Sequence, residues 1–328
     1  MAIISRRQFN IGVSAAAASG LLLGPRGAWA QAYPSQDVHF ICAFPAGSGA
    51  DVIVRWYADK LRPIMGRNII VENRVGAIGH LATEYAARAK PDGHTIYVHG
   101  PASLAANQHI IKNSKVDAAK DIVIAGTINR QPTMMVVRAD APWKTVADVT
   151  AHVRAKGDKA TYGISNPVGK VMGAIYKEHL KLKAVEVTYR TASDSLNDLA
   201  SGAIDYGMFD NIFAAAQANA GRIRMLAISM PQRLKVIPDI PTMTEQGVPM
   251  SLTGGFAAMV PAATPRPIVD QIFKMFDQVT RSEDARKFVN SIASDPWITT
   301  REEAQAFYVK DIQAWGDYVK LAKIEPQG

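Results

Sequence analysis

From residue 38 onward the chain alternates short apolar runs with segments whose apolar residues recur at helical spacing. The apolar runs have strand length and are bounded by turn residues. Such an alternation predicts an α/β fold with mostly parallel sheets. The ten expected strands are 38–44, 69–72, 95–99, 121–128, 134–138, 161–164, 185–189, 204–209, 223–229 and 256–260.

Two stretches have the character of crossings between domains. Residues 129–133 form a polar turn before a new strand, and three prolines lie in 230–241 after another strand. If both are crossings, residues 31–130 and 231–328 form one domain, and 131–230 form a second domain inserted into it. Two α/β domains joined by two strands can hinge around a ligand.

The first thirty residues have the pattern of an export signal. Arg6 and Arg7 precede a small, apolar run over 11–23, and Ala28-Trp29-Ala30 fits an A-x-A cleavage site. The paired arginines favour the twin-arginine route, with a general secretory signal as the alternative. The run is shorter than the roughly 20 residues that cross a bilayer. We therefore expect residues 1–30 to be a cleaved signal peptide and the protein to be periplasmic.

Charge and cysteine content narrow the classes of partner. Without residues 1–30 the chain keeps 34 Lys and Arg against 29 Asp and Glu, a mild excess that suits an anionic small ligand or the envelope surface. No arginine-rich run with interleaved aromatic residues is present, so no nucleic acid is expected as partner. The single cysteine, Cys42, lies inside an apolar strand, and we expect a buried core thiol.

The sequence FPAGSGAD, residues 44–51, joins the first expected strand to a helix over 51–65. A glycine-rich turn of this kind places backbone N–H groups at the positive end of a helix dipole, where anions bind. The turn lacks the third glycine of a dinucleotide motif, no phosphate-binding P-loop occurs, and Ser48 is not in a nucleophile elbow. The histidines have no metal-site spacing. We therefore expect no cofactor, no metal and no catalytic residues.

Six motifs, in order along the chain after the signal, resemble the Bug family, the periplasmic solute-binding proteins of tripartite tricarboxylate transporters. They are FPAGSGAD (44–51), VENRVGAIG (71–79), PDGHT (91–95), MFDN (208–211), IPDIPT (237–242) and VPAATP (260–265). The resemblance implies a type II periplasmic binding protein, in which two α/β domains close a hinged cleft on a carboxylate. It implies a monomer that is not an enzyme and delivers its ligand to membrane transport subunits. A sensory binding protein for a membrane kinase and a periplasmic enzyme are the alternatives.

The resemblance also implies the ligand-binding residues. They are Phe44, Ala46, Gly47, Ser48, Asp51, Gly79 and Ser103 in the first domain, and Ser165, Asn166, Tyr189, Arg190, Thr191, Asp210 and Asn211 in the second. The alternatives are structural: Phe44 as core, Asp51 as an acid at a helix start, and Asp210 and Asn211 as caps of the helix that runs to 219.

Three cationic or cation-capable residues depart from the family's pattern. Lys170, Arg130 and His80 are expected near the cleft, where they favour a ligand with a second carboxylate, either aliphatic or aromatic. An aromatic monocarboxylate or an amino acid is the next expectation. The alternative is that Lys170 and Arg130 are solvated charges at the rim.

Overall fold

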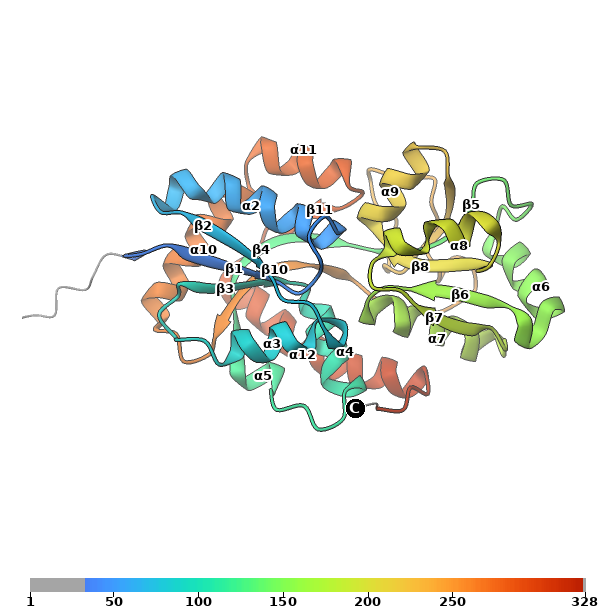
Figure 1. Ribbon diagram of the computed structural model, residues 1–328, viewed down its shortest axis with the longest axis horizontal. Coiled ribbons are helices and arrows are strands. Elements are labelled where there is room, and N and C mark those ends of the chain that lie inside the picture. Colours follow the sequence, from blue (N-terminus) through green and yellow to red (C-terminus); the bar gives the residue numbers. More distant parts are fainter. Residues whose placement is uncertain (1–32, 327–328) are drawn as a thin grey trace, which may run out of the picture.

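The computed structural model describes residues 33–326, so the expected signal peptide, 1–30, lies outside the described residues. Two mixed sheets lie end to end along the long axis (Figure 1). The first has the order β11-β4-β10-β3-β1-β2, with β1 (Val38–Cys42), β2 (Ile69–Asn73), β3 (Thr95–His99), β4 (Ile122–Gln131), β10 (Gly254–Pro261) and β11 (Asp295–Pro296). The second has the order β7-β6-β8-β5-β9, with β5 (Thr133–Arg138), β6 (Thr161–Ile164), β7 (Val185–Thr188), β8 (Tyr206–Asp210) and β9 (Ile223–Ile228).

All ten expected strands are confirmed, but the expectation of mostly parallel sheets is wrong. Strand β1 runs parallel to β2 and β3, and β6 runs parallel to β7 and β8. Strand β10 is antiparallel to both β3 and β4, β11 to β4, and β5 to β8 and β9. The reason is the connection between the sheets: β4 leads the chain out of the six-stranded sheet and β10 brings it back, so the two must run in opposite directions.

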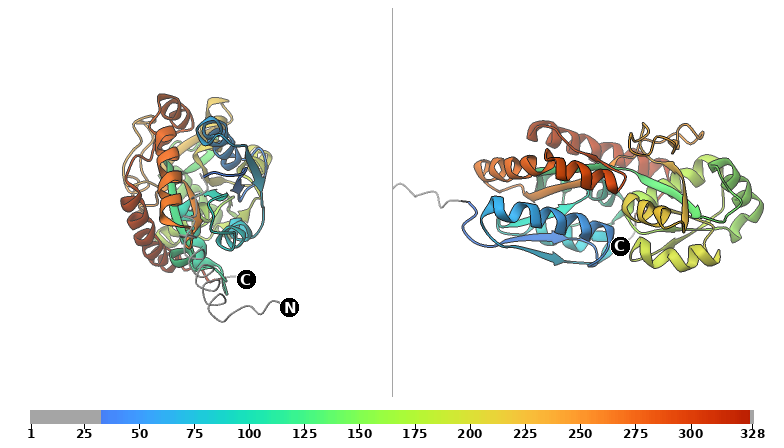
Figure 2. Two further views of the ribbon diagram at one scale, coloured as in Figure 1. Left: turned by 90° about the vertical axis from the view of Figure 1, so that its left-hand side faces the viewer. Right: turned by 90° about the horizontal axis from the view of Figure 1, so that it is seen from above.

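Helices cover both faces of each sheet (Figures 1 and 2). In the six-stranded half they are α2 (Gly49–Met65), η1 (Ala77–Gly79), α3 (His80–Ala87), α4 (Pro101–Ile110), α5 (Ala118–Asp121), α10 (Arg266–Thr280), α11 (Glu283–Ser291) and α12 (Arg301–Leu321). In the five-stranded half they are α6 (Val146–Lys156), η2 (Gly157–Lys159), α7 (Pro167–Leu180), η3 (Ala192–Ser195), α8 (Leu196–Ser201) and α9 (Asn211–Asn219).

The alternation of β1 explains how its sheet is covered. Val38, Phe40 and Cys42 belong to an apolar cluster with α2 and α10, whereas Ile41 belongs to a cluster with α3, α4 and α12. Helices α2 and α10 lie side by side on their face, where the hydroxyls of Tyr57 and Thr280 are 3.2 Å apart. Cys42 is fully buried, and burial raises the pKa of its thiol to about 11. The expected core thiol is confirmed.

The chain passes between the two sheets at two places. Pro132 separates β4 from β5, and the return lies just before β10, where Gly254 pairs with Gln131. The intervening stretch stays with the five-stranded sheet: Leu234 packs in its apolar cluster, and Leu252 N–H donates to the Ser229 carbonyl. These contacts place the return crossing near residues 252–254.

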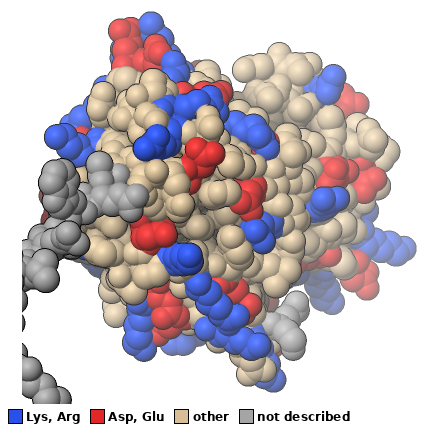
Figure 3. All heavy atoms as spheres, turned by 60° about the vertical axis from the view of Figure 1, so that its left-hand side comes forward, with Lys and Arg blue, Asp and Glu red and all other residues tan. Residues whose placement is uncertain are grey.

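Basic and acidic side chains are interspersed on the molecular surface (Figure 3). On the face in that view no broad area belongs to one sign of charge. Many of these charges pair locally, as in Arg281 with Asp277 at 2.7 Å and Lys60 with Asp284 at 2.6 Å. Exposed pairs of this kind add little stability.

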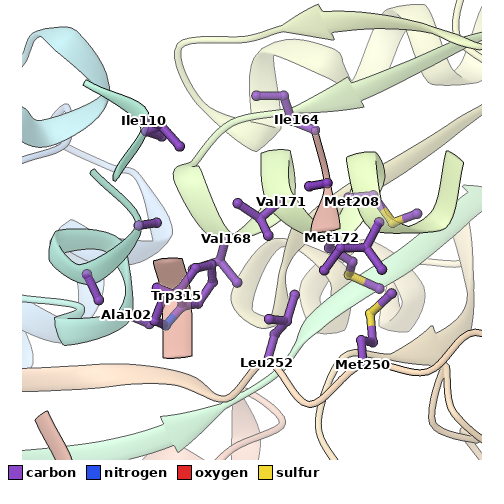
Figure 4. Close-up of a cluster of buried hydrophobic side chains, with 14 of the residues drawn as sticks. Ala102, Ile110, Ile164, Val168, Val171, Met172, Met208, Met250, Leu252 and Trp315 are labelled. Carbon is purple, nitrogen blue, oxygen red and sulfur yellow. The ribbon is translucent and has the colours of Figure 1, made fainter. Parts of the chain in front are cut away.

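A cluster of buried apolar side chains joins the two halves on one side of the molecule (Figure 4). Ala102 of α4 and Trp315 of α12 come from the six-stranded half, and Val168 and Met172 of α7 come from the other. Trp315 is buried, with 1% of the residue exposed, so α12 packs against the body of the protein. Since this cluster is continuous, the halves meet through packed side chains as well as through the crossing strands.

Candidate ligand-binding site

A cavity of about 260 Å³ lies between the two sheets. Its walls come from the turn after β1, the end of β3, the segments after β6 and β8, and both crossings. Pockets for drug-sized molecules have about 300–1,000 Å³, so this cavity suits a small ligand.

Four helices begin at the cavity wall. The first-turn residues of α2, α4, α7 and α9 all line it: Gly49, Ala102, Val168 and Ile212 are among them. Helix starts carry partial positive charge, because their first N–H groups have no partner inside the helix. Within residues 33–326, none of the lining side chains belongs to a lysine or an arginine. The groups with partial positive charge in this wall are therefore backbone N–H groups, and the wall also contains the carboxyl group of Asp210.

The turn at the start of α2 determines which of its N–H groups are free. Gly47 N–H donates to Asp51 Oδ2 at 2.9 Å, and Asp51 N–H donates to Ser48 Oγ at 3.3 Å. The N–H groups of Gly49 and Ala50 have no hydrogen-bond partner in the described part of the chain. Gly47 has a φ of +79°, so glycine is needed there for the turn. The free donors of this motif are thus Gly49 and Ala50.

Asp51 supports this turn and does not line the cavity. Its carboxylate also accepts hydrogen bonds from Arg55 Nε and Asn73 Nδ2, both at 2.8 Å. Burial opposes ionisation of Asp51, but these bonds and the one from Gly47 outweigh it, so the pKa of Asp51 is lowered. A permanently charged Asp51 holds the loop in shape.

Polar residues at other helix starts both cap a helix and line the cavity. Asn166 Oδ1 accepts the Gly169 N–H at 2.8 Å and Asp210 Oδ1 accepts the Phe213 N–H at 2.9 Å, so these residues cap α7 and α9. Thr191 caps η3. All three also line the cavity. The structural interpretation of Asp210 as a cap is confirmed, and its position in the wall is compatible with a second role.

The two halves approach each other closely beside the cavity. A Cβ atom on Gly49 would lie 3.0 Å from Asp210 Oδ1 and 3.0 Å from Ile212 Cβ. A side chain at position 49 would therefore press on Asp210 and Ile212, and one of them would have to shift. Burial raises the pKa of Asp210. The hydrogen bond from Phe213 N–H lowers this pKa, but burial has the larger effect.

His99, at the end of β3, is a lining residue that the sequence motifs do not predict. Its side chain is buried, with 1% of the residue exposed, and neither ring nitrogen has a hydrogen-bond partner in the described structure. The ring packs against Tyr97 and Phe44, with centroid distances of 5.0 and 5.4 Å. Burial lowers the pKa of His99 to about 3. The available signal was its place at the carboxyl end of a strand, where ligand sites of α/β folds gather.

The structure brings eight of the predicted site residues into the cavity wall. They are Phe44, Gly47, Ser48, Ser103, Ser165, Asn166, Thr191 and Asp210. Besides His99, the wall also contains polar residues that were not predicted, namely Gln131, Thr133, Ser193 and Gln217. The predicted residues that do not line it are Ala46, Asp51, Gly79, His80, Arg130, Lys170, Tyr189, Arg190 and Asn211.

The three extra cationic residues have partners elsewhere. Lys170 Nζ lies 2.6 Å from a carboxylate oxygen of Glu186, and the guanidinium of Arg130 lies 4.6 Å from the ring centre of Phe307. His80 is buried beside Glu84, at 3.5 Å. None of the three lines the cavity in the described structure, and their role toward a second carboxylate stays a prediction.

The remaining predicted residues also lie outside the cavity wall. Tyr189 OH donates to Asp198 Oδ2 at 2.7 Å, and Asn211 Nδ2 donates to the carbonyl of Ile292. Arg190 and Ala46 are exposed. Gly79 lies directly behind the cavity, since a Cβ on it would be 3.3 Å from His99 Nε2.

The described chain offers neither a metal site nor a membrane-spanning helix. Residues 33–326 contain no group of three or more His, Cys, Asp or Glu side chains arranged to hold a metal ion. In the same range, no helix combines the length and the apolar composition that crossing a bilayer requires.

The protein has two α/β halves, each built on a mixed sheet, and a cavity between them at which four helices begin. This arrangement is that of periplasmic binding proteins. The structure resembles BugD, with a TM-score of 0.83 and 24% identity, covering 90% of this chain and 100% of BugD. It also resembles Rpa4515 of R. palustris with adipate, with a TM-score of 0.84 and 25% identity over 90% of this chain and 100% of that one.

Sequence comparison identifies the family. The family model TctC, "Tripartite tricarboxylate transporter family receptor", matches residues 53–324, so the chain belongs to this family. It is 27% identical over 285 residues to a UPF0065 protein of Bordetella bronchiseptica, covering 86% of this chain and 80% of the relative. The predicted resemblance to the Bug family and the predicted fold class are confirmed.

Proposed function

We propose that the protein is a periplasmic solute-binding protein that captures a small organic carboxylate between its two halves. The observation that carries this proposal is the convergence of four helix starts on a cavity without lysine or arginine in its wall. One helix start contributes about 0.3–1 kcal/mol to binding an anion at an exposed site and up to about 2 kcal/mol where it is partly buried. Several together in an enclosed cavity can hold a carboxylate without a cationic side chain.

A dicarboxylate is the ligand that we favour. The donors stand on opposite walls, with Gly49, Ala50 and Ser103 on one side and Ser165 and Asn166 on the other, so each wall can hold one carboxylate. Rpa4515, 25% identical to this chain, has adipate in its structure, which supports a dicarboxylate of this size. Apolar side chains such as Ile212 and Phe213 can cover the carbon chain between the two ends.

We further propose that the halves are two domains that hinge at both crossings. The strand connections support the first boundary, near residue 130, and we move the second from 231 to about 252–254. In the described state Gly49 touches the start of α9, as in a closed form. Ligand would shift the protein toward this form, and membrane transport subunits would recognise it.

We propose no bond-making chemistry at this site. Among the lining residues of 33–326, the titratable side chains are His99 and Asp210, and no serine, threonine or cysteine nucleophile has a hydrogen bond to either. We expect export through residues 1–30 and a monomer in solution.

Binding to a defined panel of acids tests the proposal. The chain without residues 1–30 is purified and its thermal unfolding is followed with mono-, di- and tricarboxylates and amino acids, with sugars as the control class. A ligand present at 100 times its dissociation constant stabilises the protein by about 2.7 kcal/mol. We expect the largest shift from a dicarboxylate. If no carboxylate shifts the unfolding temperature, or if a sugar does, the proposed function is wrong.

A further inference from the structure

Asp210 carries the one carboxyl group in the cavity wall among residues 33–326. Its Oδ1 accepts the Phe213 N–H at 2.9 Å, as the cap of α9. Its Oδ2 accepts no hydrogen bond from the described residues, and it is not among their fully enclosed polar atoms without a partner. This oxygen is therefore available to a hydrogen-bond donor, and the side chain to which it belongs lines the cavity.

No cationic side chain in the wall compensates this carboxyl group. Within residues 33–326, no lysine or arginine lines the cavity. His99, the other titratable lining residue, has both ring nitrogens enclosed, and burial lowers its pKa to about 3, so its ring is neutral. A fully ionised dicarboxylate beside Asp210 would therefore meet a like charge in an enclosed space, which is unfavourable.

The free donors at the start of α2 lie close to this carboxyl group. The N–H groups of Gly49 and Ala50 have no partner in the described chain, and a Cβ atom on Gly49 would lie 3.0 Å from Asp210 Oδ1. A Cβ atom is about 2.5 Å from the backbone nitrogen of its own residue, so the nitrogen of Gly49 lies within about 5.5 Å of that oxygen. A carboxylate held by these N–H groups at about 2.9 Å has Asp210 as an immediate neighbour.

We infer that the ligand is an acid with a hydrogen-bond donor on the carbon next to one carboxylate, and that Asp210 accepts this hydrogen bond. This inference rests on the proposed function and narrows its class of ligand. The donor is an ammonium group, as in an amino acid, or a hydroxyl group, as in a hydroxy acid. On that carbon the donor lies beside the carboxylate held by α2 and can fill the short gap to Asp210.

This contact makes Asp210 a specificity-determining residue. A ligand with the donor gives the carboxyl group a hydrogen bond and separates it from the bound carboxylate. An unsubstituted dicarboxylate of the same length offers no donor and brings a like charge against Asp210. Specificity is the difference between these two affinities.

The test is calorimetry at pH 7 with two series of dicarboxylates whose members differ only at this carbon. One series is succinate, malate and aspartate, and the other is adipate, 2-hydroxyadipate and 2-aminoadipate. A hydrogen bond to a charged group is among the stronger ones, so we expect the wild type to bind a substituted member about 10- to 100-fold more tightly than the unsubstituted one.

Two variants distinguish the two donors, and both keep a good cap for α9 because asparagine and serine cap helices as aspartate does. Asp210→Asn keeps an acceptor without the charge, so a preference for the amino acid should fall at least tenfold, and one for the hydroxy acid should remain. In Asp210→Ser the side chain is shorter, so either preference should be lost. Asp117→Asn changes the cap of α5, outside the cavity wall, and should bind as the wild type does.

Equal affinity of the wild type for the substituted and unsubstituted members of both series overturns the inference. A preference that Asp210→Ser keeps in full overturns it as well, because the donor would then have another partner. If neither variant folds, the comparison within the wild-type series decides.

The outcomes also separate this inference from the proposed function. An unsubstituted dicarboxylate that binds as tightly as its substituted relatives leaves the proposed function intact and removes the role of Asp210. If no acid of the panel binds, both are wrong.

Discussion

Gly49 at the start of α2 lies so close to Asp210 at the start of α9 that a Cβ atom on the glycine would be 3.0 Å from Asp210 Oδ1. The same Cβ atom would be 3.0 Å from Ile212 Cβ. This contact joins two residues from opposite halves and lies beside the cavity. The space at position 49 therefore determines whether the halves can come this close.

Gly49→Val is expected to weaken binding of the best acid at least tenfold. Its branched side chain would meet Asp210 and Ile212 in the closed form but would have room when the halves separate. Calorimetry measures the affinity, and small-angle scattering measures compaction on ligand addition. Ala147→Val is the control, since Ala147 is exposed near the start of α6. Wild-type affinity and compaction in Gly49→Val would show that the observed contact has no part in closure.

Asn166→Ala is expected to lower both stability and affinity. Its side chain caps α7 and also lines the cavity, and loss of a cap costs about 0.5–2 kcal/mol. Thr145→Ala removes the cap of α6, where Thr145 Oγ1 accepts the Asp148 N–H away from the cavity. Urea unfolding should show a similar loss in both variants, while calorimetry should show weaker binding only in Asn166→Ala. Equal affinity in the two variants would reduce Asn166 to a structural cap.

Asp205 gives a prediction for the pH dependence of stability. Burial opposes its ionisation, but hydrogen bonds from Lys156, Thr161 N–H and His152 outweigh burial and lower the pKa of Asp205. A lowered carboxyl pKa stabilises the fold above its unfolded value, about 3.9, and this stability is lost as the pH falls through the folded value.

Asp205→Asn should therefore reduce the free energy of unfolding at pH 7 by about 1–3 kcal/mol. The difference from the wild type should shrink as the pH falls below about 4. Urea unfolding at pH 7, 5 and 3.5 measures this, with the exposed Asp140→Asn as control. A difference that stays constant over this range would mean that the charge of Asp205 contributes nothing.

The strands were predictable because their signal is local. In β1 the consecutive residues Phe40 and Ile41 pack on opposite faces, so both faces are apolar and the strand is visible in the sequence as a short apolar run. Strand direction was not predictable in the same way. That β10 runs antiparallel to β4 depends on which sheet each strand joins, and residues far apart in the sequence determine this.

In the candidate site, too, residues with a local sequence signal were predictable, and contacts between residues far apart in the sequence were not. Ser48, Asn166 and Asp210 were predictable because small polar residues at helix starts have a local signature. Lys170 was expected near the cleft, whereas it pairs with Glu186 of a neighbouring strand, a contact that the local sequence does not reveal. His99 was missed because nothing in its immediate sequence indicates that Tyr97 and Phe44 enclose its ring.

The central claim is that backbone N–H groups at helix starts hold the carboxylate. Ala50→Pro tests it, because proline is tolerated in the first turn of a helix and removes the N–H group, which has no partner in the described chain. Ala147 occupies the same second helical position in α6, outside the cavity, so Ala147→Pro is the matched control.

The measurement is the dissociation constant of the best acid by calorimetry for both variants and the wild type. A hydrogen bond to a charged group contributes about 1.5–3 kcal/mol, so Ala50→Pro should bind about 10- to 100-fold more weakly. Ala147→Pro should bind as the wild type does. Equal affinity in all three proteins would contradict the account.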